Sequence, residues 1–277
     1  MKRFLAIILA GLMLLSLAAC GGKGDKVVKM GLLEAGGMED MYTGEHEAHL
    51  RNDGGISNDE EWEFVNYNNL SSALLDLQSG NIALIGLNEA TANYVAARDE
   101  KIIVGKNGGD DLKTNFSMMT LDSNKEVYDI LNNAIKDMKA DGTLDSLIAN
   151  ELKAYIESEP EAKDLPHFDG AKTIKVGVTG DVPPMDFVAS NGKAAGFNIA
   201  LLTEIANRAQ VNFEIIQIES GARAMALSSN KVDAVFWTKS IVCSKCNGAW
   251  SETVDGTLVT ESYYSAASCA ITLKSDK

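Results

Sequence analysis

Two cysteines near the end of the chain have a spacing that could do chemistry. Cys243 and Cys246 are separated by Ser-Lys, a spacing shared by local disulfides, redox-active thiol pairs and half of a zinc site. A redox pair needs a thioredoxin-like βαβ context, which the surrounding sequence does not show, and a closed zinc site needs four ligands. We therefore expect a local disulfide that leaves Cys269 single, with redox and metal roles as alternatives.

A second group, His46-Glu47-Ala48-His49, resembles a metal motif only in part. Its histidines are three positions apart, whereas the zinc-binding HExxH motif needs four so that both side chains share one helix face. The group also lies in a polar stretch that contains glycine. We expect a loop here, and we expect the protein to hold no metal ion and no other cofactor.

The N-terminus has the pattern of a lipoprotein export signal. Lys2 and Arg3 precede an uncharged apolar run over residues 4–19, which is shorter than the roughly 20 residues of a transmembrane helix. Leu17-Ala-Ala-Cys20 then fits a bacterial lipobox, in which the cysteine is acylated and becomes the new N-terminus. We expect a signal peptide over residues 1–19, a palmitate-type lipid on Cys20 and a flexible tether over residues 20–26. A plain membrane anchor is the alternative.

The formal net charge of −14 excludes some partners. Nucleic acid and anionic membrane surfaces would repel such a chain, so we expect neither as a ligand. An exported chain also meets conditions in which disulfides persist.

Two segments repeat one pattern at an offset of 150 residues. In "LLDLQSGNIALIGLNEA" a helix ends at Ser79-Gly80 and an apolar strand follows over 82–87; in "AMALSSNKVDAVFWTKS" a helix ends near Ser229-Asn230 and a strand follows over 232–237. A continuous apolar strand after a helix is typical of a parallel strand buried on both faces. Further strands are expected over 27–33, 63–67, 101–105, 115–121, 173–179, 212–218 and 268–274, and helices over 125–156, with a break at Asp141-Gly142, and over 196–210.

These elements form two α/β parts. The stretch 157–172 between them is acidic, contains Pro160 and Pro166, and lacks apolar periodicity, so it reads as a linker.

Several blocks resemble the family 3 extracellular solute-binding proteins, the receptors of polar amino-acid ABC importers. They are "TIKVGVTGDVPPMDFVASNGKAAGFNIALLTEIANRA", "MALSSNKVDAVFWTKS", "VTESYYSAASCAITLK" and "DMKADGTLDSLIANEL". The resemblance implies a periplasmic-binding-protein-like fold of type II, in which two α/β lobes joined by two hinge strands close on a small solute.

The order of these blocks differs from that of the family. Residues 27–114 resemble its second lobe, 115–156 its return hinge strand and C-terminal helices, and 173–277 its first lobe. We therefore expect a circular permutant, which is physically cheap when the original ends lie near each other. A tandem fusion of two truncated receptors is the alternative. Permutation predicts that Val27 and Lys274 lie close together, at the hinge.

The resemblance also implies positions for ligand contacts. Thr238 and Ser240 match the family's pocket hydroxyls, and the loop from Asp181 to Phe187 matches the mouth of its cleft. Trp237, next to Thr238, is either a pocket wall or a core residue.

Three departures place an ordinary α-amino acid ligand in doubt. The family's carboxylate-binding Arg falls near Lys245, so a guanidinium is present only if Arg223 reaches the site. Its stacking aromatic residue falls near Ser220. Its ammonium-binding Asp falls at Asn88, with Glu89 beside it.

The function implied is that of a monomeric receptor, lipid-anchored on the outer face of the cell membrane. It delivers an amino acid or similar small polar solute to an ABC permease. A ligand-sensing or partner-binding lipoprotein without transport is the alternative. An enzyme is not expected, because no motif joins Asp181, Asp186 and Glu89 into an acid–base pair.

Overall fold

The computed structural model describes residues 27–33, 61–105, 112–156, 158, 162–243, 249–252 and 254–274. For residues 112, 243, 249 and 250 it describes the backbone alone. The expected signal peptide, lipidated Cys20, tether, histidine pair, Lys245 and Cys246 lie outside the described residues, and so does the side chain of Cys243.

The first part of the chain forms what we call the small lobe. Three parallel strands lie in the order β3–β1–β2, and the small lobe's core lies between them and two helices. The elements are β1 (Val27–Leu33), β2 (Glu61–Tyr67), α3 (Leu70–Ser79), β3 (Leu84–Asn88), α4 (Glu89–Ala96) and β4 (Ile102–Val104).

The second part forms the large lobe. Its parallel strands lie in the order β10–β6–β11, and antiparallel strands continue the sheet beyond β11. The strands are β5 (Leu112–Leu121), β6 (Thr173–Val178), β10 (Asn212–Gln217), β11 (Ala234–Cys243), β12 (Ala249–Ser251) and β13 (Thr257–Val259). The helices are α5 (Lys125–Ala140), α6 (Thr143–Glu151), α7 (Phe197–Ala209) and α8 (Arg223–Ser228). A separate small sheet contains β7 (Asp181–Val182), β8 (Asp186–Val188) and β9 (Ala194–Ala195).

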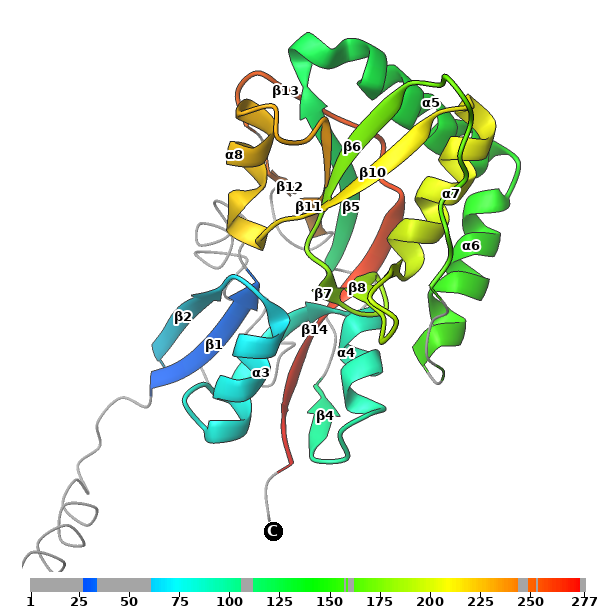
Figure 1. Ribbon diagram of the computed structural model, residues 1–277. Coiled ribbons are helices and arrows are strands. Elements are labelled where there is room, and N and C mark those ends of the chain that lie inside the picture. Colours follow the sequence, from blue (N-terminus) through cyan, green and yellow to red (C-terminus); the bar gives the residue numbers. More distant parts are fainter. Residues whose placement is uncertain are drawn as a thin grey trace, which may run out of the picture.

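One long strand, β14 (Tyr264–Leu273), joins the two lobes. Its first half pairs with β5 of the large lobe, and its second half pairs with β3 and β4 of the small lobe. A single sheet therefore passes from one lobe into the other, with the small lobe below the large one in Figure 1.

Most of the expected elements are confirmed, and the signals that predicted them have local physical causes. Gly80 ends α3 in the left-handed conformation, with φ of 76°. Gly142, with φ of 79°, separates α5 from α6 where the Asp-Gly pair predicted a break. α5 and α6 both pack against α7, and the three helices lie together on one side of the large lobe (Figure 1).

Two expectations were wrong in part. The strand expected to end at Trp237 runs on to Cys243, because after a bulge it pairs with β5. Val27 and Lys274 do lie at the same end of the small-lobe sheet, with β3 between their strands. That end is not the hinge. The first half of β14 pairs with β5 of the large lobe, and its second half then runs down the small lobe, away from β5 (Figure 1).

Within the part of the chain that the structure describes, no helix has the length and apolar character to cross a bilayer.

Candidate functional site

In each lobe, the carboxyl ends of the parallel strands face the other lobe. Asn68 follows β2 in the small lobe, and Asp181 and Ser220 come soon after β6 and β10 in the large lobe. The backbone N–H of Ser220 donates to the carbonyl oxygen of Asn68 at 3.5 Å. Ligands of open α/β sheets bind outside such strand ends, so this boundary between the lobes is the candidate site.

Asp181 makes the shortest described contact across this boundary. Its Oδ2 accepts a hydrogen bond from the backbone N–H of Leu70, the first residue of α3, at 2.7 Å. Burial raises the pKa of this carboxyl, the N–H donors of Leu70 and Ser71 lower it, and the nearby Asp186 raises it further. Asp181 thus satisfies backbone N–H groups that a helix N-terminus leaves without partners.

A pocket with a volume of about 210 Å³ opens beside the third strand end, that of the parallel part of β11. Thr238 lies opposite Ser117 of β5, and Ser240 lies opposite Asn115. Ser251 of β12 pairs with Ser240 from the other side. The pocket is lined by Asn115, Ser117, Thr238, Lys239, Ser240, Ser251, Val259, Thr260 and Ser262.

Thr238 is distinctive among these residues. It is 1% exposed, and its Oγ1 has no hydrogen-bond partner within the described structure. Buried hydroxyls are nearly always hydrogen-bonded, because burial without a partner costs about 1 to 3 kcal/mol. A hydroxyl of this kind in the wall of a polar pocket is a candidate contact for a bound solute.

A strained residue sets the direction of Thr238. Trp237 has φ of 69°, which is unusual for a residue with a bulky side chain, and it lies within the bulge between Val235 and Thr238. Its ring packs edge-on against Phe116, with centroids 5.2 Å apart, and its Nε1 donates to Oδ2 of Asp186 at 2.6 Å. Of the two possibilities for Trp237, the structure therefore shows the core residue, 6% exposed.

Asp186 anchors this region and is 1% exposed. Its Oδ1 accepts from the Thr179 hydroxyl and the Gly180 N–H, at 2.7 and 2.6 Å. Its Oδ2 accepts from Trp237 and from Nδ2 of Asn198, the latter at 2.7 Å. Burial raises the pKa of this carboxyl, and these four donors oppose the shift. All four contacts hold structure together, so Asp186 has no arrangement suited to acid–base catalysis.

Arg223 reaches the neighbourhood of the pocket but is engaged within the protein. Its guanidinium donates to the Trp237 carbonyl oxygen at 2.6 Å and pairs with Glu252 at 3.1 Å, both side chains being buried. Glu252 also accepts from the backbone N–H of Lys239 at 3.3 Å. Burial lowers the pKa of Lys239 to about 8, Arg223 lowers it as well, and Glu252 opposes both. Arg223 and Glu252 therefore form a buried ion pair close to Lys239, which belongs to β11 and lines the pocket.

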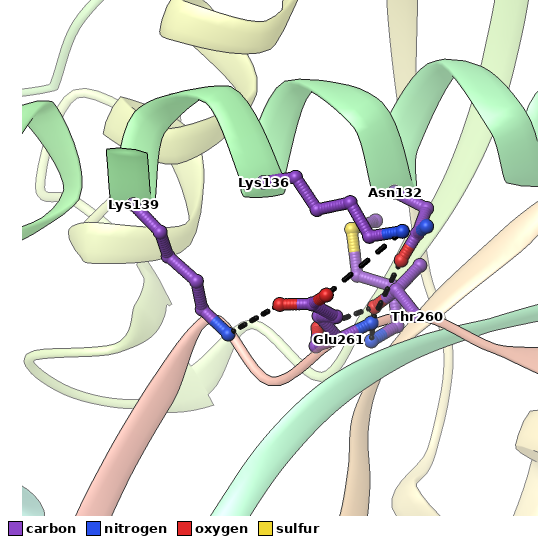
Figure 2. Close-up of polar contacts among 6 residues, drawn as sticks. Asn132, Lys136, Lys139, Thr260 and Glu261 are labelled. Atoms are coloured by element: carbon purple, nitrogen blue, oxygen red, sulfur yellow. Dashed lines mark hydrogen bonds and ion pairs between the residues drawn. The ribbon is translucent and has the colours of Figure 1, made fainter. Parts of the chain in front are cut away.

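The opposite wall of the pocket is fixed by α5. The Thr260 hydroxyl accepts from the Met118 N–H at 3.0 Å and donates to the carbonyl oxygen of Glu261. Figure 2 shows how Glu261 is held: its N–H donates to Asn132 at 2.9 Å, and its carboxylate accepts from Lys139 at 2.9 Å. The hydrogen bond and charge of Lys139 lower the pKa of Glu261, with a smaller effect from Lys136. The segment that carries Thr260 is thus clamped to α5.

The remaining expected ligand residues lie apart from this pocket. Asn88 caps α4, with its Oδ1 accepting from the Thr91 N–H at 3.1 Å and its Nδ2 donating to the Thr91 hydroxyl at 3.0 Å. Glu89 is exposed at the start of α4, and Phe187 is half-buried in β8. Of the expected residues, only Thr238 and Ser240 line the described pocket.

Sequence reasoning missed most of the pocket lining. Asn115 and Ser117 lie on the same face of β5, and the alternation of polar residues in "NFSMMTL" was the available signal. The contributions of Ser251, Thr260 and Ser262 depend on the pairing of β12 and β13, which no local pattern announces.

Residues 174–246 match the family model of the bacterial extracellular solute-binding proteins, family 3. That family consists of binding proteins, and no catalytic family is indicated. No curated protein matches the sequence significantly.

Solved structures align over most of the chain at low similarity. A ligand-binding component of an ABC-type import system from Staphylococcus aureus aligns at 10% identity with a TM-score of 0.43, covering 90% of this chain and 66% of that one. The periplasmic aliphatic sulphonate binding protein SsuA from Escherichia coli aligns at 10% identity with a TM-score of 0.41, covering 91% of this chain and 62% of that one. The chain thus spans less than two thirds of either protein. A GluR0 ligand binding core aligns at 12% identity with a TM-score of 0.39, covering 92% of this chain and 87% of that one.

The fold is α/β, with two lobes joined through β14, and the resemblance to the family 3 solute-binding proteins is confirmed over residues 174–246.

Proposed function

We propose that this protein is a lipid-anchored extracytoplasmic receptor of an ABC importer, and that it binds a small polar solute between its lobes. The observation that carries the proposal is the pocket at the carboxyl end of the parallel part of β11, where the buried Thr238 hydroxyl has no partner in the described part of the chain. The family match over residues 174–246 supports the same assignment.

Closure of the lobes on the solute is part of this proposal. Asp181 and Ser220 already contact the small lobe at the N-terminus of α3 and at Asn68. Two-lobed binding proteins close around their ligands by hinge motion. Strand β14, which pairs with strands of both lobes, is the described element through which such a motion passes.

The lipid anchor and the circular permutation are also proposals. The sequence Leu17-Ala-Ala-Cys20 supports acylation of Cys20. The shared sheet end of Val27 and Lys274 supports a permutation cut between β14 and β1, because a short loop could have joined the two strands. The proposed tether then enters at the free end of the small lobe.

The test is a thermal-shift screen of a soluble form, residues 21–277, against small polar solutes that include amino acids, hydroxy acids, polyols and amines. A ligand that binds the folded state raises the unfolding temperature in a concentration-dependent manner. We expect at least one class to do so. If no solute of a broad panel shifts the transition, the receptor assignment is wrong.

A further inference from the structure

The chemistry of the pocket wall indicates what kind of solute it takes, and this inference rests on the proposed function. Six described lining residues carry hydroxyl or amide groups on β5, β11 and the 251–262 region, in addition to the unpartnered Thr238. These groups are Asn115, Ser117, Ser240, Ser251, Thr260 and Ser262. Such groups hydrogen-bond well to the oxygens of a ligand.

Among the described lining residues there is no carboxylate. Carboxylates near the pocket are already engaged, and Glu261, between the lining residues Thr260 and Ser262, pairs with Lys139. Asp186 accepts four hydrogen bonds from protein donors, Asp181 accepts from the N-terminus of α3, and Glu252 pairs with Arg223. Because a buried ammonium group needs a carboxylate partner, the pocket has no suitable place for one.

The cationic side chains at the pocket also favour an anion. Lys239 lines the pocket, and Arg223, which pairs with Glu252, lies close enough to Lys239 to lower its pKa. A cation bound at the pocket would be repelled by Lys239, whereas an anion would be attracted to it.

The volume of the pocket limits the solute further. Its volume of about 210 Å³ lies below the roughly 300 to 1,000 Å³ of pockets for drug-sized ligands, so the pocket suits a small solute.

We propose that this pocket selects a small organic anion, a carboxylate or sulfonate that carries hydroxyl groups and no ammonium group. The hydroxyls of Thr238, Ser240 and Ser117 bind its acid oxygens and its hydroxyl group. The positive charge of Lys239, a lining residue, favours the negative charge of the solute. Thr238 is the central contact, because its hydroxyl has no partner among the residues that the structure describes.

Matched solutes test the class directly. Lactate, alanine and lactamide have nearly the same size but are respectively a hydroxy-acid anion, a zwitterion and a neutral amide; isethionate and taurine form the matching sulfonate pair. Isothermal titration of the soluble form should show that lactate or isethionate binds at least tenfold more tightly than its amino or amide counterpart. The two anions distinguish a carboxylate from a sulfonate ligand.

Equal or tighter binding of alanine or taurine would overturn the selection of an anion without ammonium, while leaving the receptor function intact. Failure of both anions would likewise overturn the inference if another class in the thermal-shift screen binds. If no solute of either experiment binds, the receptor function fails together with it.

The variant Thr238→Val separates a ligand contact from a structural role. Valine has almost the same shape and removes the unpartnered hydroxyl, so the unfolding temperature of the ligand-free protein should stay the same or rise. Affinity for the preferred anion should fall at least tenfold. The control is Thr203→Val on α7, where the hydroxyl donates to the Ile199 carbonyl oxygen and contacts no ligand in this proposal; its affinity should not change. A Thr238→Val variant that is destabilised but binds normally would contradict the role of Thr238.

Discussion

Oδ2 of Asp181 lies 2.7 Å from the backbone nitrogen of Leu70 and so joins residues 111 positions apart, on opposite lobes. This carboxylate, which lies outside the helix in sequence, accepts a hydrogen bond at the N-terminus of α3. The two lobes are therefore held together at the point where we place the cleft.

Asp181→Ala should favour the open arrangement of the lobes, because α3 loses an acceptor worth about 1 kcal/mol for a helix cap. Small-angle X-ray scattering of the ligand-free protein should give a larger radius of gyration, and solute affinity should fall. Asp181→Asn is the matched control, since its side-chain oxygen can still accept from Leu70. An unchanged radius for the alanine variant would show that this contact does not control closure.

Asp186→Asn should destabilise the large lobe strongly. Both carboxylate oxygens accept two hydrogen bonds, so the amide NH₂ must face two donors whichever way it turns. We expect a loss of about 2 to 4 kcal/mol in the free energy of unfolding, measured by urea denaturation. Asp169→Asn, at an exposed carboxylate, is the control. A loss under 1 kcal/mol would mean that the network contributes little.

Removal of Arg223 should be costly because Glu252 remains buried. Arg223→Met should lower the free energy of unfolding by about 3 to 5 kcal/mol, and the double variant Arg223→Met with Glu252→Gln should recover part of that loss. The double-mutant cycle is measured by chemical denaturation. Strictly additive losses would contradict the pairing of these two side chains.

Lys239 should make stability depend on alkaline pH. Burial lowers its pKa from 10.5 to about 8, so above pH 8 the unfolded chain binds this proton and the folded protein has released it. Its contribution to stability therefore rises with pH between about 8 and 10.5.

The difference between wild type and Lys239→Met isolates this contribution from other titrating groups. Urea denaturation between pH 7.5 and 9.5 should show a wild-type advantage that grows with pH relative to the variant. The control variant is Lys231→Met, at an exposed lysine on the loop before β11. Its free energy of unfolding should change with pH in parallel with that of wild type. A constant difference for Lys239→Met would refute the lowered pKa.

The sequence predicted the elements better than the site. Continuous apolar runs identified β3 and the parallel start of β11, and Gly80 and Gly142 marked helix ends through their left-handed conformations. These features depend on neighbours in the chain, which is why local patterns report them.

The pocket depends on contacts that no local pattern contains. The bulge at Trp237 results from pairing with β5 and from anchors on Asp186 and Arg223. Likewise, the engagement of Arg223 with Glu252, and of Asn88 with Thr91, becomes visible only in three dimensions. Residue type alone therefore could not show the contacts that these side chains make within the fold.

The most direct test of the receptor assignment is an isothermal titration of residues 21–277 with the solute that gives the largest thermal shift. The account predicts saturable binding of one solute per chain that Thr238→Val weakens at least tenfold. Absence of saturable binding, or equal affinity in wild type and Thr238→Val, would contradict a solute site at the carboxyl end of β11.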